Sequence, residues 1–569
     1  MVKKFSMLAL AGLIALPALA SASAGPSSSD GLDRKIDELS RELDRLKAQL
    51  AEQGDLSDLQ ETVESLDARS ESWDLAARFK FYGDFRSRYD YLNAGSAPAY
   101  RANDVARGMS MAMGQQMGAG PYSLQQVQMA MQGMMQQSAM AAQQMGVSPG
   151  AARAMMFQQM GITPSGVINY NNDSSFTNRF RLNMRVKATE AVEFKGRLAM
   201  YKSWGMQSNP NAPMGSAYTM DAFAWDGNST RQPIDNALLV DRAFLNWNGI
   251  GGAPIWFSIG RRPTTDGPPA HIRLGANSRM ATPIHVMDYA FDGISIGYAY
   301  RWGADMGTGR VRFCYGRGFE SGMSTTMLDD MDFGGLSWDV IKKGSRFVNV
   351  QSFMAANLVN TPDGVTFQNP LEANGIMAGD GYLDRANLGD ILHTSLVYTD
   401  KFGPVNIYGT GAWSRTMADG YDEAGNTLLG SWWQDGEEEK DGYMVLVGAR
   451  FDLDNVGLKF GAEFNWGSEN WVSMSPAHDD LYNSKLATRG WASEVYMIWD
   501  LPTGEAISKY AQTFMRLGWQ HYDYAYTGSG SWLGAPVDID ELASDPFNAQ
   551  FYPAITTQEQ VYLTFEAYF

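Results

Sequence analysis

The sequence has a single cysteine, Cys314, among 569 residues. One thiol cannot form a disulfide, a cysteine-based zinc site or a covalent haem site within the chain. Charged residues are also scarce, at 19% compared with a usual value of about 25%. The net charge of −18 argues against a nucleic-acid partner, because nucleic-acid binding needs a basic surface.

Long apolar runs are missing as well. Beyond the N-terminus, no run reaches the ~18 residues that a membrane-spanning helix requires, so a multi-helix membrane protein is excluded. Aromatic residues and glycine are abundant instead, with 12% aromatic residues and 59 glycines. So much aromatic surface is available for burial that a long disordered chain is also excluded.

The N-terminus has the features of an export signal. Lys3 and Lys4 precede a short apolar stretch over residues 5–16, and small residues suited to cleavage follow it. The stretch is too short for a spanning anchor, and no cysteine follows it for lipid attachment. We predict that residues 1–24 are a signal peptide and that the mature protein is exported.

Residues 25–72 carry a heptad pattern. Apolar residues at alternating spacings of four and three form one helical stripe, namely Leu32, Ile36, Leu39, Leu43, Leu46 and Leu50. A seam this short is marginal as an isolated helix, so it needs a partner. We predict a periplasmic coiled-coil helix that joins copies of the chain, with a homotrimer as the expected assembly. The alternative is one amphipathic helix that lies on its own domain.

From residue 77 the hydrophobic period changes from helical spacing to two. Aromatic and charged residues alternate over residues 77–91, and similar alternation recurs at 175–203, 441–466 and 559–569. A soluble sandwich would bury the apolar faces, whereas a membrane barrel would turn them toward lipid. The long strand runs, the tryptophans near strand ends and the apolar alternation up to Phe569 favour the barrel.

We therefore predict an all-β transmembrane fold, an antiparallel outer-membrane β-barrel of about 16 strands over residues 73–569. The expected strands lie near residues 77–91, 175–188, 191–203, 237–248, 254–262, 290–301, 309–316, 345–359, 364–370, 391–400, 404–415, 441–452, 455–466, 489–500, 510–524 and 559–569. Short turns and long loops alternate between them, as such a barrel requires.

Two sequence tracts carry a family resemblance. Residues 561–569 resemble the terminal strand recognised by the outer-membrane barrel assembly machinery, and residues 257–263 are similar to the Gly-Arg-x-Pro strand end of Gram-negative porins. With the export signal and the coiled coil, the chain resembles an uncharacterised porin-like barrel family of Gram-negative bacteria. The resemblance covers most of residues 25–569. It implies a place in the cell outer membrane, among its lipid and lipopolysaccharide, and supplies no substrate.

Charged side chains on barrel strands should face the lumen, since a charge at the membrane midplane costs about 2–4 kcal/mol. The predicted pore-lining residues are Arg78, Lys80, Arg86, Arg88, Arg179, Arg181, Arg185, Lys187, Lys195 and Arg197. Only Asp84, Asp90 and Glu193 oppose them on the same strands, so this wall should favour anions. The alternative is that the basic residues pair with acidic residues of a loop folded into the lumen.

The third outer loop, residues 263–289, is the expected constriction by analogy with porins. Arg262, Arg273 and Arg279 are its candidate residues. The histidines in this loop are better explained as solvated side chains than as ligands, so we predict no metal site and no cofactor.

The first outer loop, residues 92–174, has an unusual composition. Residues 109–160 contain 13 methionines and 12 glutamines, and both residue types favour helix. We expect a helix over residues 129–145 and a plug or lid that packs adaptable methionines at the pore mouth. A flexible loop, a soft-metal site built from thioethers and a docking surface for a protein partner are the alternatives.

The sequence thus predicts a porin or channel for passive diffusion of small hydrophilic solutes. The alternative is a barrel scaffold that sheaths or docks a partner protein, such as an electron-transfer conduit or a surface assembly. No nucleophile stands beside a positioned base, so we expect no catalytic residues and no enzyme activity.

Overall fold

The structure is a computed structural model that divides into two compact units, Met1–Lys80 and Phe81–Phe569. It describes residues 37–45 and 78–569, with gaps at 119, 206–232, 234–235, 264–266, 276–289, 304–305, 324–327, 361–375, 378–385, 423–424, 432–433, 476–478, 505, 507, 509–510 and 551–552. In the first unit, residues 37–45 are helical. The predicted signal peptide and most of the predicted coiled coil lie outside the described residues, so both stay predictions.

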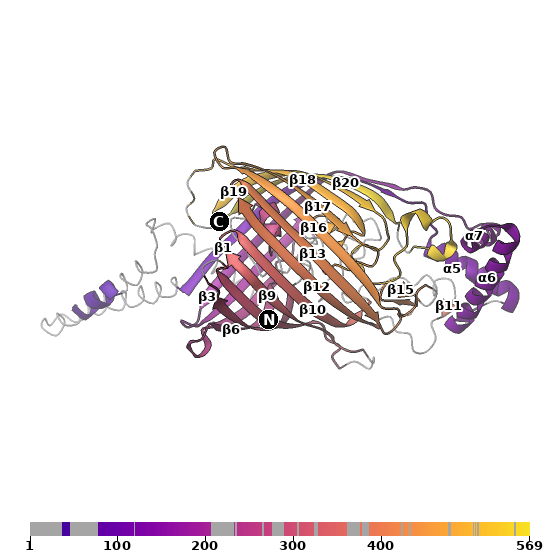
Figure 1. Cartoon of the computed structure of the whole chain (residues 1–569), viewed down its shortest axis with the longest axis horizontal. Helices are drawn as coiled ribbons and strands as arrows, with labels where there is room; N and C mark the ends of the chain where they lie inside the picture. The colour runs from indigo at the N-terminus through magenta and orange to yellow at the C-terminus, as the bar shows by residue number, and fades with distance from the viewer. Residues whose placement is uncertain are drawn as a thin grey trace. The chain divides into compact units, whose positions relative to one another are not determined.

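Sixteen strands form a closed antiparallel barrel, which confirms the predicted fold class (Figure 1). They are β1 (Phe79–Ser96), β3 (Asn169–Lys187), β4 (Val192–Ser203), β5 (Leu239–Asn248), β6 (Ile255–Pro263), β7 (Ala290–Arg301), β8 (Thr308–Phe319), β9 (Met331–Lys343), β10 (Arg346–Val359), β12 (Asn387–Phe402), β13 (Val405–Ala418), β16 (Lys440–Leu453), β17 (Leu458–Gly467), β18 (Gly490–Asp500), β19 (Gln512–Tyr524) and β20 (Ile555–Tyr568). β1 closes the barrel on β20, and the backbones of Gly83 and Phe569 exchange hydrogen bonds of 2.9 and 3.0 Å.

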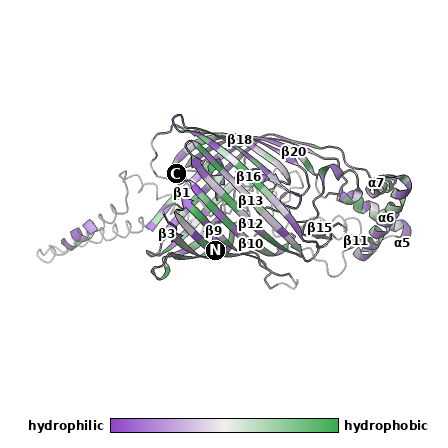
Figure 2. Ribbon diagram, viewed as in Figure 1, coloured by the Kyte–Doolittle hydropathy of each residue, from purple (hydrophilic) through white to green (hydrophobic). Residues whose placement is uncertain are grey.

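The side chains of the barrel alternate between an exposed outer face and a buried inner face. On β20, Leu563 and Phe565 are exposed, whereas Tyr562, Thr564 and Glu566 are buried. Hydrophobic and hydrophilic residues accordingly intermix along the long barrel strands on the visible side (Figure 2). A soluble sandwich would show the opposite arrangement, so the apolar face of this barrel is its outer face.

The two ends of the barrel differ in the length of their connections. At one end, which we call the turn end, strands are joined by short segments such as residues 188–191, 344–345 and 403–404. At the other, the loop end, the connections are long and include residues 468–489 and 525–554. The loop end therefore has enough chain to fold back into the lumen.

The number of strands agrees with the prediction, but the position of one strand differs from it. β9 was not predicted, because Gly334 and Gly335 interrupt its apolar pattern. The expected strand at residues 364–370 lies outside the described residues, and β10 pairs directly with β12.

The methionine-rich first loop contains three helices, α5 (Ala102–Met117), α6 (Leu124–Met145) and α7 (Pro149–Gln159). α6 includes the stretch expected to be helical and begins with a capping box, in which Ser123 and Gln126 each accept from the other's backbone N–H. The helices share a small apolar core to which Met109 and Met131 contribute. None of the described helices is both long and apolar enough to cross a membrane.

The first loop is tied to the last loop of the barrel. Arg153 of α7 forms an ion pair with Asp545, and its guanidinium lies 4.8 Å from the ring centre of Phe547. A two-residue strand, β2 (Tyr122–Ser123), pairs in parallel with β11 (Ile376–Met377). These contacts join the helices to the loop end.

Candidate functional site in the barrel lumen

Two loops enter the lumen from the loop end. One contains α8 (Ala270–Arg273), and the other, residues 468–489, contains the short helix η3 (Lys485–Ala487). Ile272, Trp471 and Leu486 of these loops belong to one apolar cluster with inward-facing residues of β13 and β16. The indole nitrogen of Trp471 donates to the carbonyl of Leu486 at 2.7 Å, which fixes the second loop on itself.

The inner face near the loop end is apolar on one side. Phe333, Phe353 and Ile391 of β9, β10 and β12 are buried there, in one cluster with residues of the loops 419–439, 468–489 and 525–554, namely Leu428, Leu429, Val472, Met474 and Trp532. The expectation of a polar lumen wall is wrong at this place, because the loops shield these side chains from water. Part of the barrel interior is thus an ordinary hydrophobic core.

The lumen opens toward the turn end. On the inner face of β3, the exposed fraction of the side chain falls from 42% at Arg185 to 5% at Arg181 and 8% at Arg179. Lys401, also near the turn end, is 35% exposed. Solvent therefore enters from the turn end and is excluded further in by the two loops.

Four arginines, which we call the arginine cluster, converge on one loop residue, and three of them contact its carboxylate. The carboxylate is that of Asp479, and the arginines are Arg86 and Arg88 of β1, Arg179 of β3 and Arg516 of β19. One Asp479 oxygen lies 2.5 Å from Arg86 and 2.7 Å from Arg179, and the other lies 3.1 Å from Arg516. Arg88 donates to the Asp479 backbone carbonyl at 3.0 Å.

The arginine cluster controls the ionisation of Asp479. Burial by itself raises the pKa of this carboxyl, but the charges of Arg86, Arg179 and Arg516 outweigh that effect and hold the pKa well below its usual value. The ring of Tyr562 lies under two of the guanidinium groups, at 4.5 Å from Arg88 and 5.1 Å from Arg516. Asp479 is therefore a fixed negative charge in a basic pocket.

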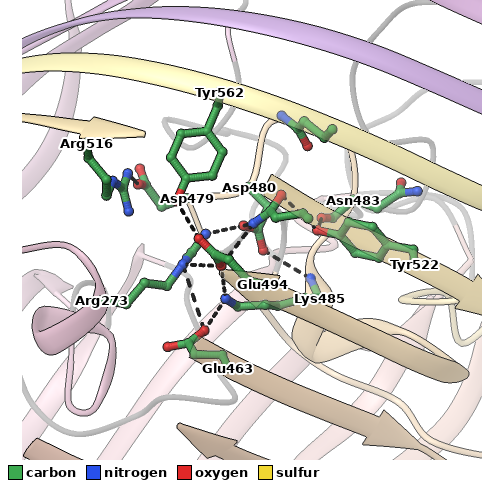
Figure 3. A network of polar contacts seen from close by, with 12 residues as sticks. Arg273, Glu463, Asp479, Asp480, Asn483, Lys485, Glu494, Arg516, Tyr522 and Tyr562 are labelled. Carbon is green, nitrogen blue, oxygen red and sulfur yellow. Dashed lines mark hydrogen bonds and ion pairs between the residues drawn. The ribbon is translucent and has the colours of Figure 1, made fainter. Parts of the chain in front are cut away.

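A second network surrounds Arg273, whose side chain is fully buried (Figure 3). Its Nε lies 2.7 Å from Glu494 of β18, and its Nη2 contacts Asp480 of loop 468–489. Lys485 of the same loop pairs with Glu494 and with Glu463 of β17. The network thus joins both inward-folded loops to the wall. Burial favours the neutral form of Arg273, but the carboxylates of Asp480 and Glu494 raise its pKa well above the ordinary value.

Smaller ion pairs join neighbouring strands near the turn end. Glu193 accepts from Arg185 and lies 2.6 Å from Lys195, and Arg197 pairs with Asp241 of β5. These contacts neutralise part of the basic wall, but their carboxylates belong to strands, whereas the alternative of structural pairing named acidic residues of a loop.

The predicted pore-lining residues are distributed as follows. Arg86, Arg88, Arg179, Arg181 and Arg197 are buried on the inner face, Arg185 and Lys195 are half-buried near the turn end, and Lys187 is exposed at the end of β3. Arg78 directly precedes β1 and Lys80 is the second residue of that strand, and both are exposed. Their pore-lining role stays a prediction.

The constriction candidates are also only partly brought together. Arg273 enters the lumen, but Arg262 belongs to β6 rather than to the loop, and its guanidinium donates to the Ser258 carbonyl at 3.3 Å. Arg279 lies outside the described residues. The loop 468–489, which supplies Asp479 and Lys485, was not predicted to enter the lumen. Its adjacent acidic residues do not distinguish it from the other acidic loops of the sequence.

A protein family matches most of this chain. Residues 169–569 match the family described as "Protein of unknown function (DUF3373)", which is most of the chain. The chain belongs to this family. The match begins at the first residue of β3 and runs through β20, so it covers every strand of the barrel except β1. No curated protein sequence matches the chain.

The solved structures that this DUF3373 protein is similar to share little sequence with it. They include an anion-selective porin from Comamonas acidovorans (10% identity, 86% of this chain and 99% of that chain, TM-score 0.37). The outer membrane channel DcaP of Acinetobacter baumannii matches at 10% identity over 86% of this chain and 97% of that chain, with a TM-score of 0.36. OprB of Pseudomonas putida matches at 9% identity over 88% of this chain and 96% of that chain, with a TM-score of 0.38. The barrel assignment rests on the closed strand order itself.

Proposed function

We propose that this protein is an outer-membrane channel for small hydrophilic solutes, with a lumen narrowed by two inward-folded loops. The observation that supports this proposal is a closed barrel with apolar residues outside and a dense set of charged residues inside. Such a barrel places a polar path across a membrane without exposing a charge to lipid. Side chains near the turn end are exposed and those near the loop end are buried. We therefore expect the inward-folded loops to limit the flow of solute.

The proposed preference is for anions. The basic residues of the wall are largely paired, so the preference should be weaker than their number suggests. The arginine cluster, described above, supplies the remaining positive potential where the loop 468–489 meets the wall. A reversal-potential measurement across a salt gradient tests this, and a cation-selective current would refute it.

Assembly belongs to the same proposal. A homotrimer formed through the N-terminal helix and the barrel walls would sit among outer-membrane lipid and lipopolysaccharide. The lumen is occupied by the chain's own loops, so a partner that threads through the barrel would have to displace them. For that reason we favour the channel over the scaffold that sheaths a partner protein.

Single-channel recording of the full-length protein in planar bilayers tests the channel. Replacing residues 470–487 with a short glycine linker should raise the conductance several-fold, because loop 468–489 is then absent from the lumen. Excision of α6 is the matched control, since α6 has 22 residues and packs in a cluster without inward-facing strand residues. Equal conductance in the wild type and the shortened variant, or no current from folded protein, would refute the proposal.

A further inference from the structure

The arginine cluster is built like an anion-binding site whose ligand is part of the chain. Both oxygens of the Asp479 carboxylate are engaged, one by Arg86 and Arg179 and the other by Arg516. The guanidinium groups come from β3, β1 and β19, which with β20 form one continuous stretch of wall. Asp479 comes from a different part of the molecule, the loop 468–489. The site therefore exists in the wall, and the loop fills it.

The charge balance of the wall favours an anion at this place. Arg86, Arg88, Arg179, Arg181 and Arg516 line it, and the strand carboxylates within 4 Å of them are those of Asp84, Asp90 and Glu566. Among the residues that the structure describes, five guanidinium groups thus face three strand carboxylates. The wall carries a surplus of positive charge that Asp479 only partly offsets.

Unused hydrogen-bond donors point to the same conclusion. Within the part of the chain that the structure describes, the Nε atoms of Arg86, Arg179 and Arg516 and Nη1 of Arg516 are buried without a hydrogen-bond partner. These three residues are 1%, 7% and 0% exposed. Buried donors on charged groups are costly to leave unpaired, so the site can accept more oxygen atoms than one aspartate provides.

The local backbone of Asp479 also bears on whether it can leave the arginine cluster. Its backbone φ of 62° lies in the left-handed region that side chains disfavour. Its neighbour Asp480 faces the other way along the loop, toward Arg273. Release of Asp479 from the cluster therefore need not break the Arg273 network.

From this geometry we propose that the arginine cluster is a binding site for carboxylate-bearing small solutes and that Asp479 is a built-in competitor which such a solute displaces. The carboxylate class follows from the group that fills the site, a planar acceptor with two oxygens that the guanidinium groups contact from both sides. The inference rests on the proposed channel function, for which it names the solute class, but binding can be measured without conduction.

The test is calorimetric titration of succinate into the detergent-solubilised full-length protein. Asp479→Asn should bind succinate at least about tenfold more tightly than the wild type, within the usual range of coupling between a switch and its ligand. Asp480→Asn is the matched control, because it removes the neighbouring loop carboxylate that faces Arg273, and it should leave affinity within about twofold of wild type. Asp479→Asn combined with Arg516→Gln should lose the gain.

Several outcomes would overturn the inference. Equal gains in Asp479→Asn and Asp480→Asn would mean that a loosened loop, rather than a vacated site, causes the effect. Binding of inorganic phosphate without binding of succinate would refute the carboxylate class. Asp479→Ser repeats the experiment if the asparagine variant fails to fold, as judged by heat-modified gel migration. Planar-bilayer recording separates the two proposals: binding without current refutes the channel alone, and current without binding refutes this site alone.

Discussion

Removal of Arg273 should release the loop 468–489 from the lumen. This side chain is fully buried and contacts Asp480 of the loop and Glu494 of β18. In Arg273→Met, three buried carboxylates, those of Glu463, Asp480 and Glu494, are left with the single ammonium group of Lys485. Methionine has a similar length and no charge, so the substitution removes the ionic contacts with little change in volume.

The size of the effect follows from the cost of breaking a buried ion pair, about 3–5 kcal/mol. At 1.4 kcal/mol per factor of ten, the ratio of docked to released loop should fall by roughly a hundredfold to several thousandfold. An exposed pair gives the comparison: Arg415 and Asp441 are 40% and 35% exposed, and such a pair is worth about 0–1 kcal/mol. Arg415→Gln should therefore leave the loop docked.

Trypsin can report the released state, because Lys485 is 1% exposed while the loop is docked. Cleavage after Lys485 should accelerate in Arg273→Met in proportion to the released population, when opening is fast relative to cleavage. Single-channel recordings of the same protein should show longer or larger openings. If Arg273→Met is cleaved at the wild-type rate and conducts like the wild type, the buried network does not hold the loop, and the reasoning fails.

Three further predictions follow from other parts of the molecule. The pKa of Asp479 in the folded protein lies well below its usual value. Its ion pairs therefore stabilise the docked loop at any pH above the pKa of about 3.9 that the carboxyl has in the unfolded chain. They are lost only as the pH falls through the lower pKa of the folded protein. Conductance should therefore not change between pH 7 and pH 5 through this group, and a channel opening in that range that depends on Asp479 would contradict its low pKa. Val495 is 51% exposed on the outer face of β18. Val495→Lys should therefore cost about 2–4 kcal/mol of barrel stability in lipid, whereas Val495→Leu should be nearly neutral. Equal urea unfolding midpoints for the two variants would place this face away from lipid. Ser123→Ala removes the capping box of α6 and should cost that helix about 1 kcal/mol, seen as faster amide exchange in its first turns, while barrel exchange stays unchanged.

The architecture could be predicted because a barrel repeats one local rule many times. Each strand alternates lipid-facing apolar residues with inward-facing residues, as in Phe565 beside Glu566, so the pattern accumulates along the sequence. One strand escaped because its pattern is locally weak: β9 carries Gly334, Gly335 and Asp332 near its start. The correct strand number therefore included one missed strand.

The contents of the lumen could not be predicted in the same way. Whether an inward position meets water or a folded loop depends on contacts between residues far apart in the sequence. Phe353 and Trp532 share a core across about 180 residues of chain, and Arg86 meets Asp479 across 393 residues. The arginines were identifiable from alternation alone, but their partner was not, because no local pattern marks Asp479 as buried.

The two contact types of loop 468–489 differ in how readily they separate. Val472 and Met474 belong to an apolar cluster, where separation exposes hydrophobic surface to water without compensation. Asp479 and Lys485 sit in ion pairs, and buried ion pairs recover hydration free energy when they separate, so that they stabilise less than an apolar contact of the same size. We therefore expect the loop to pivot on its apolar start and to release its charged middle. A carboxylate-bearing solute that arrives from the open turn end would replace Asp479 on the arginines. The buried guanidinium groups would then never be left without a negative partner, a state that would be unfavourable.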